Sequence, residues 1–340
     1  MTTPLDLSQD AATPWRVVYS GLQFPGEVVV GGDWRDRYGE ALPAGLSFRV
    51  AFLRSHAALH PPALAKGVVV AMPSPRPSPE AQQATRQLGA LREVQAGYLT
   101  STSSELRALG RSLAREEQKA AARLHTDLAR AYASGAIVAS TAVRGDAGAV
   151  FGLPGPTAWA DSLAGAVLGV VHPQTPIAPS LLTRPVTPAD VRPLLSVVSG
   201  SSDASSGGDA AMLLPGLRLR RQDLEHSPVL EFVQAAIKRG GKLGVVALLD
   251  ELSQSLGLPR YLAPVFIVAY IARNRPASEL DLMDSHEITH RSGAPFLGDR
   301  LSWDVLSDIA WPEDLERRVV ALGPAQPPTS RSPLPYGVEL

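Results

Sequence analysis

The fold of this chain is decided by one stretch, residues 227–274, which reads SPVLEFVQAAIKRGGKLGVVALLDELSQSLGLPRYLAPVFIVAYIARN. Apolar residues recur in it at helical spacing, which predicts three helices, over Ser227–Lys238, Lys242–Leu256 and Arg260–Asn274. The following residues alternate between polar and apolar and then reach a turn, which predicts a β-hairpin over His286–Arg300. Three helices followed by a hairpin are the order of a winged helix.

The predicted hairpin contains one motif with a chemical interpretation, the sequence HEITH at residues 286–290. On a helix, such a motif places His286 and His290 on one zinc ion, and Glu287 activates the bound water of a metallopeptidase. In a strand, the two histidines share a face and Glu287 points away. The two residues before His290 are β-branched, and Gly293–Pro295 would end any helix at once.

We therefore favour the hairpin, which predicts no bound metal and no cofactor. The alternative is a zinc metallopeptidase with Glu287 as the catalytic residue and His286 and His290 as the metal ligands. The two functions belong to different classes, a binding module and an enzyme.

The N-terminal part of the chain predicts a small sheet. Short β-branched runs separated by Gly, Pro and charged residues occur at Arg16–Ser20, Glu27–Gly31, Leu46–Leu53 and Gly67–Met72. Further along, Ile137–Val143 is a candidate strand. Two shorter helices are predicted at Thr157–Val171 and Asp190–Val198.

A long helix is predicted from Thr102, where Thr102 and Glu105 have the spacing of a capping box, to about Ser134. One apolar stripe runs along it: Leu106, Leu109, Leu113, Ala120, Leu124 and Leu128. Such a stripe is typical of an ordinary packing face, and binding of a partner helix is the alternative.

These elements predict an α+β protein with several parts. We expect a small β-rich domain at residues 1–77 and a helical middle domain at residues 78–198. A flexible Ser/Gly-rich linker follows at residues 199–212, then the winged-helix domain at residues 213–322. The proline-rich tail at residues 323–340 is expected to be disordered.

Composition narrows the classes of function. The formal net charge is −1, so the whole chain has no electrostatic attraction to nucleic acid or anionic membranes. With no cysteine, disulfides and thiolate catalysis are excluded. The N-terminus lacks the pattern of a signal peptide, and the longest apolar runs are far shorter than the ~20 residues of a membrane span. We expect a soluble, cytoplasmic protein.

Two further classes of function receive little support from the sequence. No Gly-x4-Gly-Lys-Ser/Thr loop is present, so the chain is expected neither to bind nor to hydrolyse ATP. The third predicted helix is almost entirely apolar, whereas a helix that reads DNA exposes polar and basic side chains. The candidate DNA-contacting residues are those that flank it or lie in the wing: Arg260, Arg273, Arg275 and Arg291. Contact with other protein subunits is favoured, and DNA is a second, weaker candidate partner.

Parts of the sequence resemble the region that follows the ATPase core in large bacterial phage-exclusion ATPases (BREX-type, PglY-like). The resemblance lies in several short segments: Tyr132-Ala133-Ser134-Gly135, residues 172–176 (HPQTP), and the block from Leu256 to Trp311 with Asn274-Arg275-Pro276, Arg291-Ser292-Gly293 and Asp299-Arg300-Leu301. The nucleotide-binding loop of those proteins is missing here. The resemblance therefore implies a non-ATPase component of an anti-phage defence complex.

Overall fold

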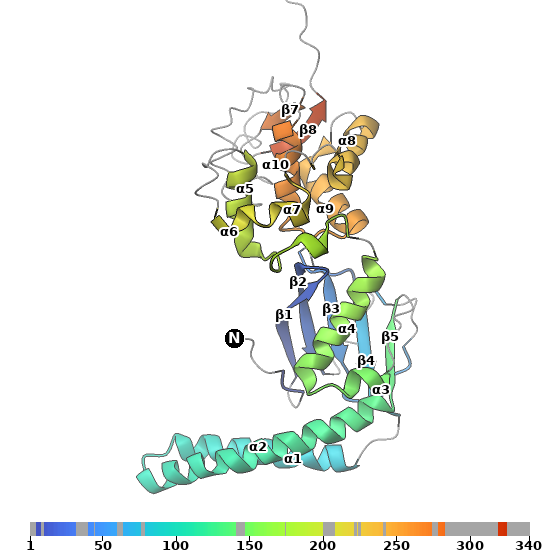
Figure 1. Cartoon of the computed structure of the whole chain (residues 1–340). Helices are drawn as coiled ribbons and strands as arrows, with labels where there is room; N and C mark the ends of the chain where they lie inside the picture. Colours follow the sequence, from blue (N-terminus) through green and yellow to red (C-terminus); the bar gives the residue numbers. More distant parts are fainter. Residues whose placement is uncertain are drawn as a thin grey trace, which may run out of the picture. The chain divides into compact units, whose positions relative to one another are not determined.

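The computed structural model describes residues 5–7, 10–31, 40–43, 45–59, 64–75, 79–140, 147–173, 175–199, 208–220, 223, 226–240, 243–273, 278–282 and 319–324. The protein is mixed α+β, with an N-terminal sheet and a largely helical remainder (Figure 1). Its contacts define two compact units. Unit 1 comprises Met1–Tyr19 and Phe24–Pro173, and unit 2 comprises Ser20–Gln23 and Gln174–Leu340.

Unit 1 is built on a five-stranded sheet with the order β1-β2-β3-β4-β5. The strands are β1 (Ala11–Tyr19), β2 (Leu22–Val30), β3 (Phe48–Phe52), β4 (Val68–Met72) and β5 (Ala136–Ala139). β2, β3 and β4 are parallel, and β5 is antiparallel to β4. The four predicted N-terminal strands and the predicted strand after residue 136 are thus confirmed.

The central strands are buried on both faces, as their mostly apolar sequences indicate, and the one charged residue of β3, Arg49, pairs with Glu27. Every residue of β3 and β4 is buried. Helix α4 (Pro156–Val171) packs against β1, β3 and β4 and crosses the sheet in Figure 1. The sequence prediction of this helix is confirmed, and Pro156 stands in its first turn, where a missing backbone N–H costs nothing.

A long helical hairpin is inserted between β4 and β5. It consists of α1 (Pro79–Leu99) and α2 (Ser104–Ala133), which pack side by side (Figure 1). The capping residue predicted for the long helix, Thr102, lies one residue before the observed N-cap. Ser103 is the N-cap, and its side chain accepts a hydrogen bond from the backbone N–H of Leu106.

The base of the hairpin is fastened to the strand ends by a few buried contacts. The Tyr132 hydroxyl donates a hydrogen bond to the Leu53 carbonyl, with an O–O distance of 2.8 Å. The Ser74 backbone N–H donates to the Ala131 carbonyl at 2.9 Å. The Tyr132 ring also contacts three aromatic rings, those of Phe52, Phe151 and Trp159. These contacts hold the end of α2 against the carboxyl ends of β3 and β4.

The same contacts explain how unit 1 is composed. β5 follows α2 and pairs with β4, and α4 packs on the sheet, so residues 78–173 belong with the N-terminal strands. The division between the units near residue 173 therefore differs from the boundaries expected at residues 77 and 198.

Unit 2 begins with short helical elements. They are the 3-10 turns η3 (Pro179–Leu181) and η4 (Pro188–Asp190) and the helices α5 (Val191–Ser199), α6 (Gly208–Ala211) and α7 (Leu214–Leu217). A capping box at Thr187 and Asp190 starts η4, and Arg184 forms a two-bond ion pair with the same carboxylate. Burial alone would raise the pKa of Asp190, but its hydrogen bonds with Arg184 and Thr187 lower it. The predicted helix at residues 190–198 is confirmed.

The rest of unit 2 contains three longer helices and a small sheet. In chain order they are α8 (Pro228–Gly240), β6 (Leu243–Gly244), α9 (Val245–Leu256), α10 (Ala263–Arg273), β7 (Ser278–Leu282) and β8 (Val319–Pro324). The sheet has the order β6-β8-β7, with antiparallel pairs. The three helices predicted from residues 227–274 are confirmed.

The segments that flank these helices either differ from the predictions or lie outside the described residues. β8 includes Gly323 and Pro324, which the sequence analysis assigned to the tail, because both residues pair with β7. The predicted hairpin over residues 286–300 lies outside the described residues, as do residues 200–207 of the linker and residues 325–340 of the tail. Across the described part of the chain, no helix combines the length and apolarity needed to cross a membrane.

Our first prediction concerns the close approach of Gly135 to β4. A Cβ atom at this position would lie 1.9 Å from the Met72 carbonyl oxygen and 2.8 Å from the Pro73 carbonyl carbon. Both are backbone atoms, so Gly135→Ala is expected to lower the free energy of unfolding by about 3 kcal/mol, the upper end of overpacking costs. Urea unfolding measures the change.

Gly165→Ala is the matched control, because a Cβ on this glycine of α4 meets nothing within 4 Å. It should be neutral or raise the free energy of unfolding by up to about 1 kcal/mol. Equal midpoints of urea unfolding for the two variants would contradict the close packing of Gly135 against β4.

Our second prediction concerns His172, which is 8% exposed and stacks on Phe24 with a centroid distance of 5.7 Å. Burial, helped by the charge of Lys66, lowers its pKa to about 4. In the unfolded chain the value is about 6.5, so between pH 6.5 and pH 4 the unfolded state binds more protons. The free energy of unfolding should therefore fall by up to about 3 kcal/mol as the pH drops through this window.

Urea unfolding at pH 7 and pH 4.5 tests this, with His172→Gln as the comparison. The variant should lose most of this pH dependence. An equal loss of stability in both proteins at pH 4.5 would assign the effect to other groups.

Candidate functional site

Of the site residues predicted from the sequence, Arg260 is described in full. It precedes α10 and forms an ion pair with Asp250 of α9, so its guanidinium is engaged within unit 2. Arg273 is the last residue of α10, and its side chain is not described. The other predicted residues lie outside the described part of the chain: Arg275, His286, Glu287, His290 and Arg291. The described residues therefore place one predicted site side chain, that of Arg260.

Helix α10 is a packing helix. Residues 262–269 are all buried, and those other than Pro264 are at most 1% exposed. This confirms the expectation that the third helix is covered by its neighbours. It presents no exposed face over these residues that could enter a groove of DNA.

The described residues contain no group of three or more His, Asp or Glu side chains that could hold a metal ion. The structure does contain three other features that could bind a partner or ligand. They are the distal end of the α1–α2 hairpin, a pocket at its base and a shallow pocket in unit 2.

The distal end of the hairpin exposes large apolar side chains. Val94 and Leu99 at the end of α1 are both 45% exposed, and Leu106 and Leu109 at the start of α2 are 38% and 46% exposed. We call these four residues the distal apolar cluster. The proximal part of the hairpin differs, because Ala84, Leu88 and Leu124 form a buried cluster there.

The apolar stripe predicted along the long helix is therefore divided. Its proximal residues, Ala120, Leu124 and Leu128, pack within the hairpin, as expected of a packing face. Its distal residues Leu106 and Leu109 do not. The interpretation as a packing face is thus confirmed for the proximal residues, and for the distal residues the alternative, binding of a partner helix, stays a prediction. Gly110 is buried and lets α2 approach the Tyr98 and Leu99 side chains closely.

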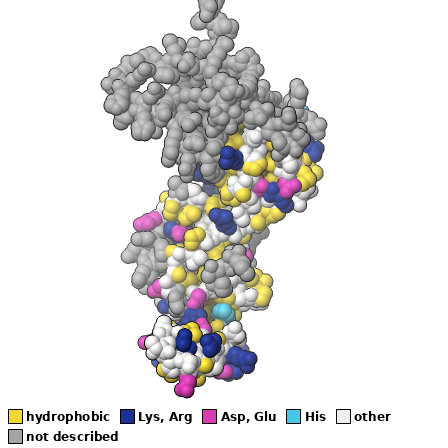
Figure 2. Space-filling model, turned by 90° about the vertical axis from the view of Figure 1, so that its left-hand side faces the viewer, with side chains coloured by type: hydrophobic (Ala, Val, Ile, Leu, Met, Phe, Trp, Pro, Cys, Tyr) yellow, Lys and Arg dark blue, Asp and Glu magenta, His cyan; other side chains and the backbone are white. Residues whose placement is uncertain are grey.

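Basic side chains accompany the distal apolar cluster. Arg107, Arg111 and Arg115 are exposed and four residues apart, so they form a row along α2. None of the three forms an ion pair with another described residue, whereas Lys119 pairs with Glu116 and Arg92 with Glu117. Figure 2 looks toward this end of the hairpin and shows basic side chains beside hydrophobic ones.

The second feature is a pocket of about 520 Å³ in unit 1. Its walls are residues 54–56, which follow β3, residues 73–75, which follow β4, and the facing sides of α1 and α2. The described residues that line it include the basic side chains of Arg54, His56 and Arg86 and no acidic one. This site was not predicted from the sequence. Its one available signal was the position of Arg54 and His56 directly after a buried strand.

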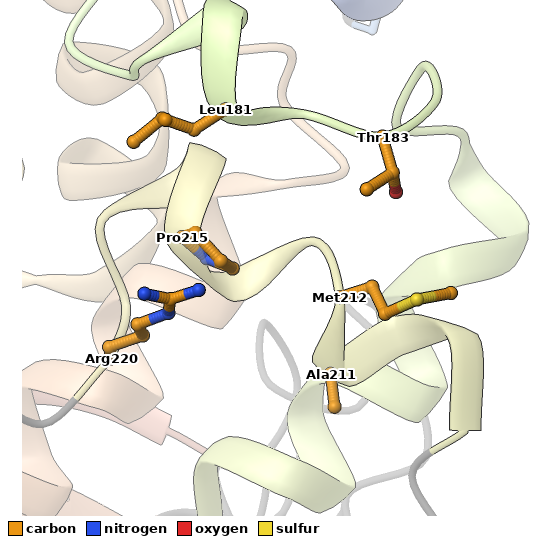
Figure 3. Close-up of a pocket in the computed structure, with 6 residues that line it drawn as sticks. All are labelled: Leu181, Thr183, Ala211, Met212, Pro215 and Arg220. Atoms are coloured by element: carbon orange, nitrogen blue, oxygen red, sulfur yellow. The ribbon is translucent and has the colours of Figure 1, made fainter.

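The third feature is a shallow pocket of about 450 Å³ in unit 2, shown in Figure 3. Its lining is mostly apolar: Leu181, Thr183, Ala211, Met212, Pro215 and Arg220. Arg220 lies beside Pro215 in Figure 3, while Thr183 and Met212 lie on the other side. Among the described residues that line it, Arg220 is the one charged side chain, which gives the pocket little basis for selecting a ligand.

Comparison with protein-family models, with curated proteins and with solved structures found no match for this chain. The function has to be inferred from the described residues themselves.

Our third prediction concerns nucleic acid. Because Arg260 is engaged with Asp250 and α10 is buried, the chain should bind random duplex DNA with a Kd weaker than about 1 μM at physiological salt. Arg260→Ala should leave this weak binding unchanged and lower the free energy of unfolding by no more than about 1 kcal/mol. Fluorescence anisotropy over a series of salt concentrations measures the binding. Submicromolar, salt-sensitive binding that Arg260→Ala abolishes would instead make DNA the main candidate partner.

Proposed function

We propose that this chain is a non-catalytic winged-helix protein that acts as a protein-interaction component of a bacterial anti-phage defence complex. One observation carries the protein-contact role: the α1–α2 hairpin exposes the distal apolar cluster next to a row of arginines. The defence setting follows from the resemblance to phage-exclusion ATPases and from the missing nucleotide-binding loop.

The order of elements in unit 2 supports the winged-helix part of the proposal. α8, β6, α9 and α10 are followed by β7 and β8, and β8 lies between β6 and β7. Helices followed by a pair of antiparallel strands are what a winged helix requires. The wing predicted over residues 286–300 lies outside the described residues.

The occupant we propose for the distal end of the hairpin is an acidic segment of another protein that also carries apolar residues. Val94, Leu99, Leu106 and Leu109 offer apolar contact. The guanidinium groups of Arg107, Arg111 and Arg115 would pair with carboxylates of the partner.

A second copy of this chain fits the surface less well. A twofold symmetric interface brings the same patch of both subunits together. The row of three arginines would then face its own copy, and like charges at close range are unfavourable. This favours a different protein as the partner.

Our fourth prediction tests this surface in the full chain. A photo-crosslinking amino acid at position 109, introduced in the native host, should crosslink to a protein segment rich in Asp, Glu and apolar residues. The same amino acid at position 126, an exposed site on the proximal half of α2, should not. Mass spectrometry identifies the crosslinked segment, and calorimetry on the purified pair gives the Kd.

Two double variants then separate the apolar and the charged contributions. Leu106→Ser with Leu109→Ser should weaken binding at least about tenfold, since each truncated anchor costs about 1 kcal/mol or more. Arg107→Glu with Arg111→Glu should have a similar effect that diminishes at high salt.

The controls are Val18→Ser, at an apolar side chain 49% exposed on β1, and Arg123→Glu on the proximal half of α2. Both should bind normally. Crosslinks to a second copy, to lipid or to nucleic acid, or binding that the distal variants leave unchanged, would overturn the proposal.

A further inference from the structure

The pocket at the base of the hairpin lies where ligands commonly bind to sheets of this kind. In open sheets with parallel strands, ligands bind beyond the carboxyl ends of the strands. β3 and β4 are neighbouring parallel strands, and the pocket is lined by the residues directly after each of them. Its volume of about 520 Å³ falls within the range of ~300–1,000 Å³ typical of small-molecule sites.

The charge of the lining indicates the kind of ligand. Arg54 and Arg86 enter the pocket from different elements, the segment after β3 and the second turn of α1. Arg54 also pairs with Asp10 at 3.0 Å, and both side chains are largely exposed, so water weakens this pairing. Arg86 forms no ion pair with any described residue. Among the described residues that line the pocket are two arginines and no carboxylate, which favours an anionic ligand.

His56 is oriented by a backbone contact. Its Nδ1 atom lies 3.2 Å from the Pro73 carbonyl oxygen. A carbonyl oxygen can only accept a hydrogen bond, so Nδ1 carries the proton and donates. The second ring nitrogen, Nε2, is the other polar atom of this ring.

The walls of the pocket are fixed before any ligand arrives. The hydrogen bonds from Tyr132 to Leu53 and from Ser74 to Ala131 tie the strand ends to α2 on one side of it. Leu7 and Leu128 add apolar surface to the lining. A preformed site loses little free energy to ordering when a ligand binds.

We propose that this pocket binds a small organic dianion. Arg54 and Arg86 hold its charged groups, since guanidinium groups match the geometry of phosphate and carboxylate oxygens. Its apolar body lies against Leu7 and Leu128. The same chemistry is shared by a phosphate monoester and by a dicarboxylate, and these two sources are separated by experiment.

Our fifth prediction uses calorimetry on the full chain with four probes: phenyl phosphate, phthalate, inorganic phosphate and phenol. At least one of the two organic dianions should bind with a Kd of about 1 mM or tighter. Inorganic phosphate should bind more weakly, because it lacks an apolar body, and neutral phenol should not saturate. If phenyl phosphate binds more tightly than phthalate, the natural ligand is assigned as a phosphate ester. If phthalate binds more tightly, the natural ligand is assigned as a dicarboxylate.

Two variants assign binding to the pocket. Arg86→Gln removes an exposed charge and should raise the Kd of the dianion at least about tenfold. Gln82→Trp, at an exposed lining position one turn earlier on α1, should block the pocket without changing its charge. Arg123→Gln, at an exposed position of α2 outside the described pocket lining, is the matched control and should bind the dianion normally.

The unfolding midpoints of all three variants should equal that of the unmodified chain. Failure of both organic dianions to saturate overturns the proposal. So does equal binding by Arg86→Gln and Gln82→Trp, or binding of phenol as tight as that of phenyl phosphate.

Discussion

The hydrogen bond from the buried Tyr132 hydroxyl to the Leu53 carbonyl is the interaction on which the rest of unit 1 depends. The chain leaves the sheet after β4, extends through α1 and α2, and must return so that β5 can pair with β4. Tyr132 fixes this return. Its burial raises the pKa of the phenol, so the hydroxyl keeps the proton that it donates. Gly135 then allows the backbone to pass directly against Met72.

Both candidate sites of unit 1 follow from this attachment. Because the hairpin is held at one end, its base and the strand ends enclose the basic pocket, and its other end extends beyond the sheet. α1 takes part in both sites: Arg86 lines the pocket, while Val94 and Leu99 belong to the distal apolar cluster. Lengthening or shortening α1 by about two-thirds of a helix turn would displace the side chains of both sites at once. Both sites therefore require the same register of α1 on α2.

Local patterns predicted most elements, whereas long-range contacts could not be read from the sequence. The apolar runs of β3 and β4 and the periodicity of α8, α9 and α10 are local signals, and each indicated its element correctly. The pairing of β5 with β4 joins segments more than sixty residues apart, and no local pattern encodes it. The pocket escaped prediction for the same reason, because Arg54 and Arg86 meet only in three dimensions. Leu109 and Leu124 occupy equivalent positions of one apolar stripe, yet only Leu124 is covered.

Stability and binding can be separated on the hairpin because different residues serve them. Leu88 and Leu124 are buried where the helices pack, and Arg92 joins α1 to Asp6 and to Glu117 of α2. At the distal end, the close approach is made by Gly110 and the neighbouring side chains of α1, while Leu106 and Leu109 keep much of their surface in water. Shortening an exposed side chain removes little buried area, so its cost to folding is small. An apolar surface that folding does not require is typical of a site at which a partner binds.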